Sequence, residues 1–150
     1  LEHLLAPNGP LTKRIFSKDE LNDASLGWKA AKAVAGFDIG QTVVVQGGAV
    51  IAVEGMEGTD ACVERAAALA RTSGREPSLV VVKVAKPRQD FRFDLPVVGL
   101  ETLVNFKAAS VKAIALEAGS TLIFDRNRFA IDADAAGIAV AGYPPEGPIL

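Results

Sequence analysis

The sequence is poor in the residues that build disulfides and transition-metal centres. Its 150 residues include one cysteine, Cys62, and one histidine, His3. A single cysteine excludes an internal disulfide and a cysteine-rich zinc site. A single histidine near the end of the chain disfavours multi-histidine metal centres and Ser–His or Cys–His catalysis. Cys62 lies in an alanine-rich stretch of helical character, which predicts a buried, structural thiol.

The sequence also lacks a dominant charge and a long hydrophobic run. The sequence contains 16 Lys and Arg residues and 18 Asp and Glu residues, which gives a net charge of -2. No basic stripe marks a surface for nucleic acid. The longest apolar run, residues 43–53, is interrupted at Gln46, Gly47 and Gly48, and falls short of the roughly 20 residues that span a bilayer. The chain starts abruptly at Leu1 without a methionine, which suggests a fragment or a processed product.

The length of the chain and its 49% hydrophobic residues are sufficient for one domain with a core, over residues 1–150. The pattern of predicted elements indicates an α/β domain. Residues 41–46 and 49–54 are β-branched runs separated by Gly47-Gly48, the pattern of an antiparallel hairpin. From Asp60 onward, predicted helices and buried strands alternate, which indicates parallel crossovers. We therefore expect a mixed, mostly parallel sheet with an antiparallel hairpin and helices packed on it.

Local signals set the limits of the other elements. Ser17 and Glu20 predict a capping box at the start of the first helix. Helices are expected at residues 17–35, 60–71, 99–109 and 125–136, and strands at 79–84, 111–116 and 138–141. Trp28, Phe37 and Phe106 are expected in the core. The tail, residues 142–150, contains three prolines and is expected to be mobile or to face a partner.

Three polar clusters follow predicted strands, and they gather at one sheet edge if those strands are parallel neighbours. Their members are Glu54, Gly55, Glu57, Gly58, Thr59 and Asp60; Lys83, Lys86, Gln89, Asp90, Arg92 and Asp94; and Glu117, Gly119, Ser120 and Thr121. In the first cluster, Gly55 and Gly58 let backbone N–H groups approach an anion at a helix start. An ordinary turn capped by Thr59 or Asp60 is the simpler interpretation, since no Walker or dinucleotide motif is present.

The second cluster has the richest chemistry. Its Lys and Arg side chains suit phosphate oxygens, and its aspartates suit Mg²⁺ or an attacking water. This combination favours phosphoryl over acyl transfer. The alternative is that Asp90 and Asp94 pair with neighbouring arginines on the surface, an arrangement worth little energy and favoured on composition alone. Glu117 is a candidate partner across the cleft.

Three segments carry a family resemblance: residues 41–60, residues 83–102 and residues 115–122. With them, the chain from about residue 17 to 142 resembles the Mg²⁺-dependent UDP-2,3-diacylglucosamine pyrophosphatases. These enzymes replace a metallophosphatase-like enzyme in some Gram-negative bacteria. The resemblance covers only the C-terminal domain of that family, so the N-terminal domain is absent from this sequence.

The resemblance implies that water attacks the α-phosphorus of UDP-2,3-diacylglucosamine, giving UMP and 2,3-diacylglucosamine 1-phosphate (lipid X) on the route to lipid A. It implies Mg²⁺ at Asp90 and Asp94, with Asp94 favoured over Asp90 as the essential aspartate. Substrate contacts are carried over more loosely to Lys86, Gln89, Arg92, Gly55, Gly58, Thr59 and Glu117.

The resemblance also implies partners and a location. The partners are the lipid-linked UDP-sugar and the absent N-terminal domain, between which the substrate would lie. The expected location is the cytoplasm, at the inner face of the inner membrane, with peripheral membrane contact; a homodimer is left open. The alternative function is a non-catalytic module that binds a phosphate or sugar nucleotide for a separate catalytic domain.

Overall fold

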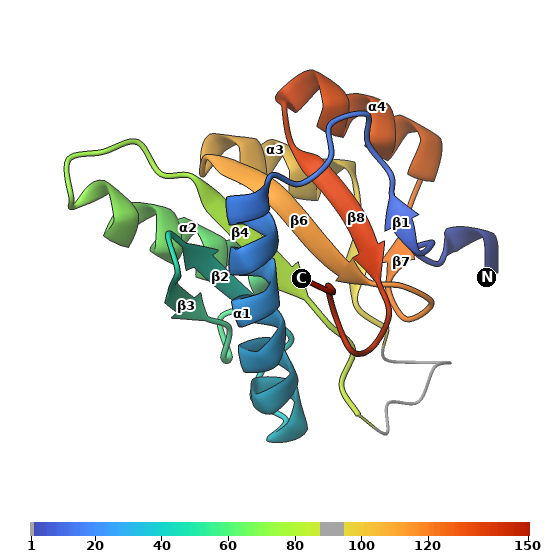
Figure 1. Cartoon of the computed structure of the whole chain (residues 1–150), viewed down its shortest axis with the longest axis horizontal. Helices are drawn as coiled ribbons and strands as arrows, with labels where there is room; N and C mark the ends of the chain where they lie inside the picture. Colours follow the sequence, from blue (N-terminus) through green and yellow to red (C-terminus); the bar gives the residue numbers. More distant parts are fainter. Residues whose placement is uncertain (1, 88–94) are drawn as a thin grey trace.

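The computed structural model describes residues 2–87 and 95–150. Its main sheet has six strands in the order β1-β8-β6-β4-β2-β3, and β5 and β7 form a second, two-stranded parallel sheet (Figure 1). The strands are β1 (Gly9–Pro10), β2 (Thr42–Gln46), β3 (Ala49–Val53), β4 (Leu79–Lys83), β5 (Val97–Val98), β6 (Val111–Glu117), β7 (Leu122–Ile123) and β8 (Ala139–Tyr143).

The direction of the strands confirms the expected mixed α/β fold. The central strands β4, β6 and β8 are parallel neighbours, while β1 pairs with β8, β2 with β4, and β3 with β2 in antiparallel fashion. Because β2 is antiparallel to both of its neighbours, β3 runs in the same direction as β4. Four of the six strands therefore end at the same edge of the sheet.

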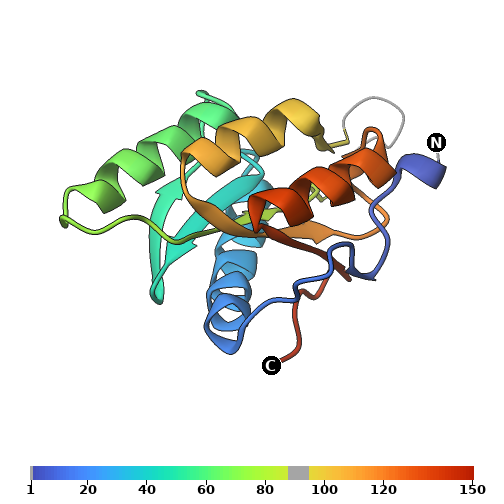
Figure 2. The same cartoon turned by 90° about the horizontal axis from the view of Figure 1, so that it is seen from above.

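The helices cover both faces of the main sheet (Figure 2). They are α1 (Lys18–Gly36), α2 (Thr59–Arg71), α3 (Leu100–Ala108) and α4 (Arg126–Ala136), and a short 3-10 helix, η1 (Glu2–Leu4), precedes β1. Helix α1 packs on one face, and α2, α3 and α4 pack on the other. Side chains alternate along β4, so Val80 and Val82 pack with the α1 core and Leu79 and Val81 with the opposite core.

Helix α1 begins and packs as its sequence predicts. Ser17 Oγ accepts a hydrogen bond from the Glu20 backbone N–H at 3.1 Å, and the Glu20 carboxylate accepts one from the Ser17 N–H at 2.9 Å. The expected capping box is confirmed. A Cβ atom at Gly27 would lie 2.8 Å from Val82 Cγ2, so the glycine lets α1 approach the sheet closely.

The hairpin turn is also confirmed. Gly47 and Gly48 have φ of 58° and 81°, which a two-residue primed turn requires. The carboxylate of Asp23 on α1 accepts hydrogen bonds from both glycine N–H groups, at 3.1 and 2.8 Å. The turn is therefore held by its own geometry and by the helix that covers it.

One expectation about an apolar residue was wrong. Phe37 is 80% exposed because α1 ends at Gly36, so Phe37 follows the last turn and leaves the packed face, whereas Trp28 and Phe106 are buried. The first residues of the tail belong to the fold, and the expected contact of the tail with a partner stays a prediction. Strand β8 continues to Tyr143, and Trp28 Nε1 donates a hydrogen bond to the Pro145 carbonyl at 2.9 Å.

Candidate functional site

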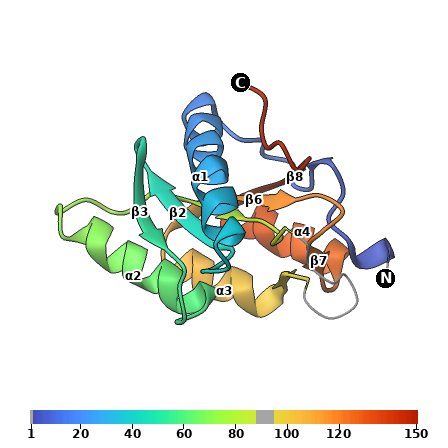
Figure 3. The same ribbon diagram turned by 90° about the horizontal axis from the view of Figure 1, so that it is seen from below.

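The ends of β3, β4, β6 and β8 form what we call the carboxyl edge of the main sheet, which Figure 3 views from below. Each of the three polar clusters begins here: Glu54 follows β3, Lys83 ends β4, and Glu117 ends β6. The condition for their convergence, parallel neighbouring strands, is met by β4 and β6. This is the edge at which α/β sheets commonly bind ligands.

The first and second clusters meet at Thr59. Lys83 Nζ donates a hydrogen bond to Thr59 Oγ1 at 2.7 Å, and Thr59 Oγ1 donates one to Glu54 Oε2 at 3.1 Å. The other carboxylate oxygen of Glu54 accepts a hydrogen bond from the Gln41 N–H at 2.7 Å. Thr42 Oγ1 lies 3.2 Å from Thr59 Oγ1. We call Glu54, Thr59 and Lys83 the Thr59 network.

Lys83 is partly buried, and its surroundings change its pKa. Removal from water lowers the pKa of its ammonium group below the ordinary value, and the nearby charges of Glu54 and Asp60 act in the opposite direction. Within residues 2–87 and 95–150, no carboxylate forms an ion pair with Lys83. Its hydrogen bond there goes to the neutral hydroxyl of Thr59.

The second and third clusters meet at Glu117, which is 4% exposed. Its carboxylate forms an ion pair with Lys32 of α1 and accepts a hydrogen bond from the Ala85 N–H at 3.2 Å. Nothing in the local sequence around Lys32 indicated this pairing, so the role of Lys32 was missed. The signal needed to find it is the pairing of residues far apart in the chain, which local periodicity does not contain.

Two further contacts hold the segment after β4. Lys86 Nζ forms an ion pair with Asp38 at 2.8 Å, and Asp38 has a φ of 58° in the turn after α1. Gln41 Nε2 donates a hydrogen bond to the Val84 carbonyl at 3.1 Å. The chain that leads toward residues 88–94 is thus held by the turn after α1, by the residue before β2 and by the end of β6.

In the loop around Gly55 and Gly58, the acidic side chains pair with neighbouring residues. Gly58, with a φ of 88°, is the N-cap of α2, so the expected cap at Thr59 or Asp60 was wrong. Asp60 instead accepts a hydrogen bond from Asn105 Nδ2 at 2.9 Å. Glu57 pairs with Arg65 at 2.7 Å, and the hydrogen bond from that guanidinium lowers the pKa of the carboxyl group.

The candidates for catalysis and metal binding, Asp90 and Asp94, lie outside the described residues, as do Gln89 and Arg92. Among the residues that the structure does describe, no group of three or more His, Cys, Asp or Glu side chains is placed to hold a metal ion. The chemistry of Asp90 and Asp94 nevertheless fits Mg²⁺, which typically binds one or two carboxylates together with substrate phosphates and water.

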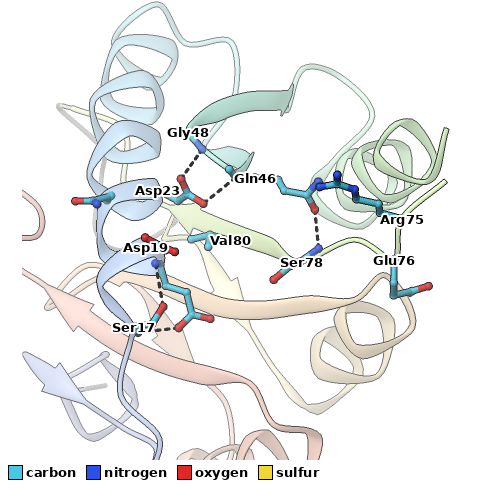
Figure 4. Close-up of a pocket in the computed structure, with 12 residues that line it drawn as sticks. Ser17, Asp19, Asp23, Gln46, Gly48, Arg75, Glu76, Ser78 and Val80 are labelled. Atoms are coloured by element: carbon cyan, nitrogen blue, oxygen red, sulfur yellow. Dashed lines mark hydrogen bonds between the residues drawn. The ribbon is translucent and has the colours of Figure 1, made fainter. Parts of the chain in front are cut away.

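A second concave region lies at the opposite edge of the sheet (Figure 4). This open pocket has a volume of about 730 Å³ and is bordered by the start of α1, the hairpin turn and the start of β4. Several of its polar groups bind one another. Gln46 accepts a hydrogen bond from the Ser78 N–H at 2.6 Å, and Asp23 binds the turn. None of the predicted site residues lines it.

Within the described ranges, no helix is both long enough and apolar enough to cross a bilayer. Residues 7–141 match a family model described as the LpxI C-terminal domain. The chain is also 38% identical, over 143 residues, to the UDP-2,3-diacylglucosamine pyrophosphatase LpxI of Caulobacter vibrioides. The match covers 93% of this chain and 51% of that relative, so the chain spans about half the relative's length. The chain therefore belongs to the LpxI C-terminal domain family.

Proposed function

We propose that this chain is the catalytic domain of an enzyme that hydrolyses UDP-2,3-diacylglucosamine in lipid A biosynthesis. A water oxygen bonds to the α-phosphorus, and the bond from that phosphorus to the bridging oxygen breaks. The products are UMP and 2,3-diacylglucosamine 1-phosphate. The name of the Caulobacter relative, together with 38% identity over 93% of the chain, supports this activity.

The end of β4, at the carboxyl edge, is the structural feature that best supports this function. Lys83 stands at the carboxyl edge beside Thr59, and Ala85 is bound by the buried carboxylate of Glu117. Residues 88–94 follow in sequence, and they hold both candidate aspartates. An α/β sheet places its ligands outside the carboxyl ends of its strands, so this position suits a catalytic segment.

We assign the reaction to Asp94, with Asp90 as the alternative. A carboxylate there positions the attacking water and accepts its proton. Asp90 and Asp94 would hold Mg²⁺, which when bound neutralises charge on the phosphate oxygens. Lys86, Gln89 and Arg92 would bind the phosphates, and Gly55, Gly58 and Thr59 would border the nucleotide.

The remaining half of the relative's length corresponds to an N-terminal domain, which we propose as the partner that closes the site. The lipid part of the substrate needs apolar cover. Phe37 and Ile39 precede β2 and Met56 follows β3, so these exposed side chains, between 53% and 103% accessible, border the carboxyl edge. We propose that they face the acyl chains or the partner domain, in an enzyme that works at the cytoplasmic face of the inner membrane.

The test is a fusion in which this chain replaces the matched half of the Caulobacter relative. The fusion is incubated with UDP-2,3-diacylglucosamine, Mg²⁺ and ¹⁸O-labelled water, and the products are identified by mass spectrometry. We expect UMP that carries the label and 2,3-diacylglucosamine 1-phosphate that does not. A chelator should stop the reaction, and added Mg²⁺ should restore it.

The intact Caulobacter relative is the positive control, and circular dichroism shows whether the fusion is folded. A folded fusion that binds substrate but releases no UMP would contradict the catalytic proposal. That result would support the alternative, a module that binds a phosphate or sugar nucleotide for another domain. Label in the sugar phosphate instead of UMP would show that water attacks the other phosphorus.

A further inference from the structure

Lys83 is a partly buried cation of the second polar cluster, and the proposed function gives it no role of its own. An ammonium group has three N–H donors, and within the described residues Lys83 uses one, to Thr59 Oγ1 at 2.7 Å. The residues around it leave the positive charge without an ion-pair partner in that part of the chain. A charge that is partly removed from water usually has a partner, because desolvation without one is unfavourable.

A purely structural role explains this arrangement poorly. Thr59 Oγ1 already donates to Glu54 Oε2 at 3.1 Å and lies 3.2 Å from Thr42 Oγ1, so the hydroxyl has other polar neighbours. The site therefore does not need a cation to satisfy Thr59. A charge retained in a position that lowers its pKa is typical of functional sites.

The position of Lys83 indicates what its charge is for. It is the last residue of β4, at the carboxyl edge, and its partner Thr59 is the first residue of α2. The preceding residue, Gly58, offers no side-chain cap to α2. The positive end of α2 and the ammonium of Lys83 therefore favour the same kind of ligand, an anion.

We propose that Lys83 binds a phosphate group of the uridine nucleotide, and that Thr59 is the residue that positions its ammonium group. The nucleotide as ligand rests on the proposed function; the phosphate as ligand rests on the charge and place of Lys83. Lys86 and Arg92 belong to the segment after β4, so Lys83 would contact the ligand from the body of the sheet.

The test measures binding of UMP, pyrophosphate and uridine by calorimetry, with the chain and with the fusion described above. Lys83→Met keeps the length of the side chain and removes its charge. We expect this variant to bind UMP and pyrophosphate at least tenfold more weakly than wild type and to bind uridine with unchanged affinity. The matched control is Lys107→Met on the exposed face near the end of α3, which should stay within twofold of wild type.

Stability separates ligand binding from a structural role. Removing a partly buried charge that has no ion-pair partner among the described residues should leave the melting temperature of Lys83→Met unchanged or higher. A lower melting temperature with unchanged affinity would overturn the proposal. Thr59→Val should lower the affinity for UMP. Thr59→Ser keeps the hydroxyl and should bind UMP as wild type does.

The remaining outcomes distinguish this inference from the proposed function. If Lys83→Met binds UMP as wild type does, Lys83 has no phosphate role, and the hydrolase proposal is unaffected. If wild type binds pyrophosphate but does not bind UMP, and the fusion releases no UMP from the substrate, the phosphate role of Lys83 stands. The identification of the ligand as a uridine nucleotide is then wrong. If neither the wild-type chain nor the wild-type fusion binds any of the three probes, the inference is overturned.

Discussion

The carboxylate of Glu117, at the end of β6, accepts a hydrogen bond from the Ala85 N–H at 3.2 Å and pairs with Lys32 of α1. One buried carboxylate thus joins a strand, the helix on one face of the sheet, and the chain that leads to residues 88–94. The substrate-binding role expected for Glu117 stays a prediction. Its contacts support a positioning role for the segment that follows β4.

Glu117→Ala should destabilise the fold by about 2–3 kcal/mol, measured by urea unfolding. This is less than the roughly 3–5 kcal/mol of a fully buried pair, because the Lys32 side chain is 32% exposed. Glu117→Gln keeps an acceptor for Ala85 and should cost less. Combining Glu117→Gln with Lys32→Met removes both charges and should return stability to within about 1 kcal/mol of wild type. Equal losses in all three variants would argue against the ion pair.

Gly40 lets the chain pass close to Glu54. A Cβ atom at position 40 would lie 2.1 Å from the Glu54 carbonyl oxygen, so Gly40→Ala must displace backbone. We expect a loss of about 1–3 kcal/mol in unfolding free energy. Because Glu54 belongs to the Thr59 network, UMP affinity should fall as well. Gly36→Ala is the control: its Cβ meets nothing within 4 Å, and alanine favours a helix, so stability should rise by about 0.5–1 kcal/mol. Equal effects of the two alanines would contradict this account.

Stability should fall at alkaline pH partly because of Cys62. Burial raises the pKa of its thiol from 9.0 to about 11. As the pH rises from 9 to 11, the unfolded chain loses this proton while the folded chain keeps it, so folding becomes less favourable. Cys62→Ala should show a shallower loss between pH 9 and 10, measured by urea unfolding at each pH. Parallel slopes for the two proteins would contradict the assignment. Burial also raises the pKa of Tyr143 to about 12. Stability should therefore fall above pH 10 in both wild type and Cys62→Ala.

Asp94→Ala in the fusion should keep substrate affinity and reduce the rate of UMP release by at least a hundredfold, the scale of a lost general base. Asp90→Ala tests the alternative assignment under the same conditions. Lys107→Met serves again as a variant distant from the carboxyl edge. Full activity in both aspartate variants would show that catalysis lies outside residues 88–94.

Local signals predicted the elements of this fold well. The Gly47-Gly48 turn and the capping box of Ser17 and Glu20 depend on residues close in sequence, and both were confirmed. Phe37 was placed in the core on hydrophobicity alone, and it is exposed because the helix ends one residue earlier. The helix was already expected to end at residue 35, before Phe37, so hydrophobicity and not the helix boundary led to the wrong placement.

The site depended on contacts that the local pattern does not encode. Lys83 and Thr59 are 24 residues apart, and Lys32 and Glu117 are 85 apart. Strand order and register bring each pair together, and several strand orders share the same hydrophobic pattern. The sequence therefore indicated which loops carry polar residues, while the pairing of Lys32 with Glu117 emerged only from the three-dimensional structure.

Binding of the nucleotide at the carboxyl edge of the main sheet is tested most directly by NMR, in a titration of the ¹⁵N-labelled chain with UMP and Mg²⁺. We expect the largest amide shifts at Thr59, Val84, Ala85 and Ala118, with little change at the opposite edge. Shifts concentrated at Gly47, Gly48 and Ser78, around the pocket of Figure 4, would contradict it.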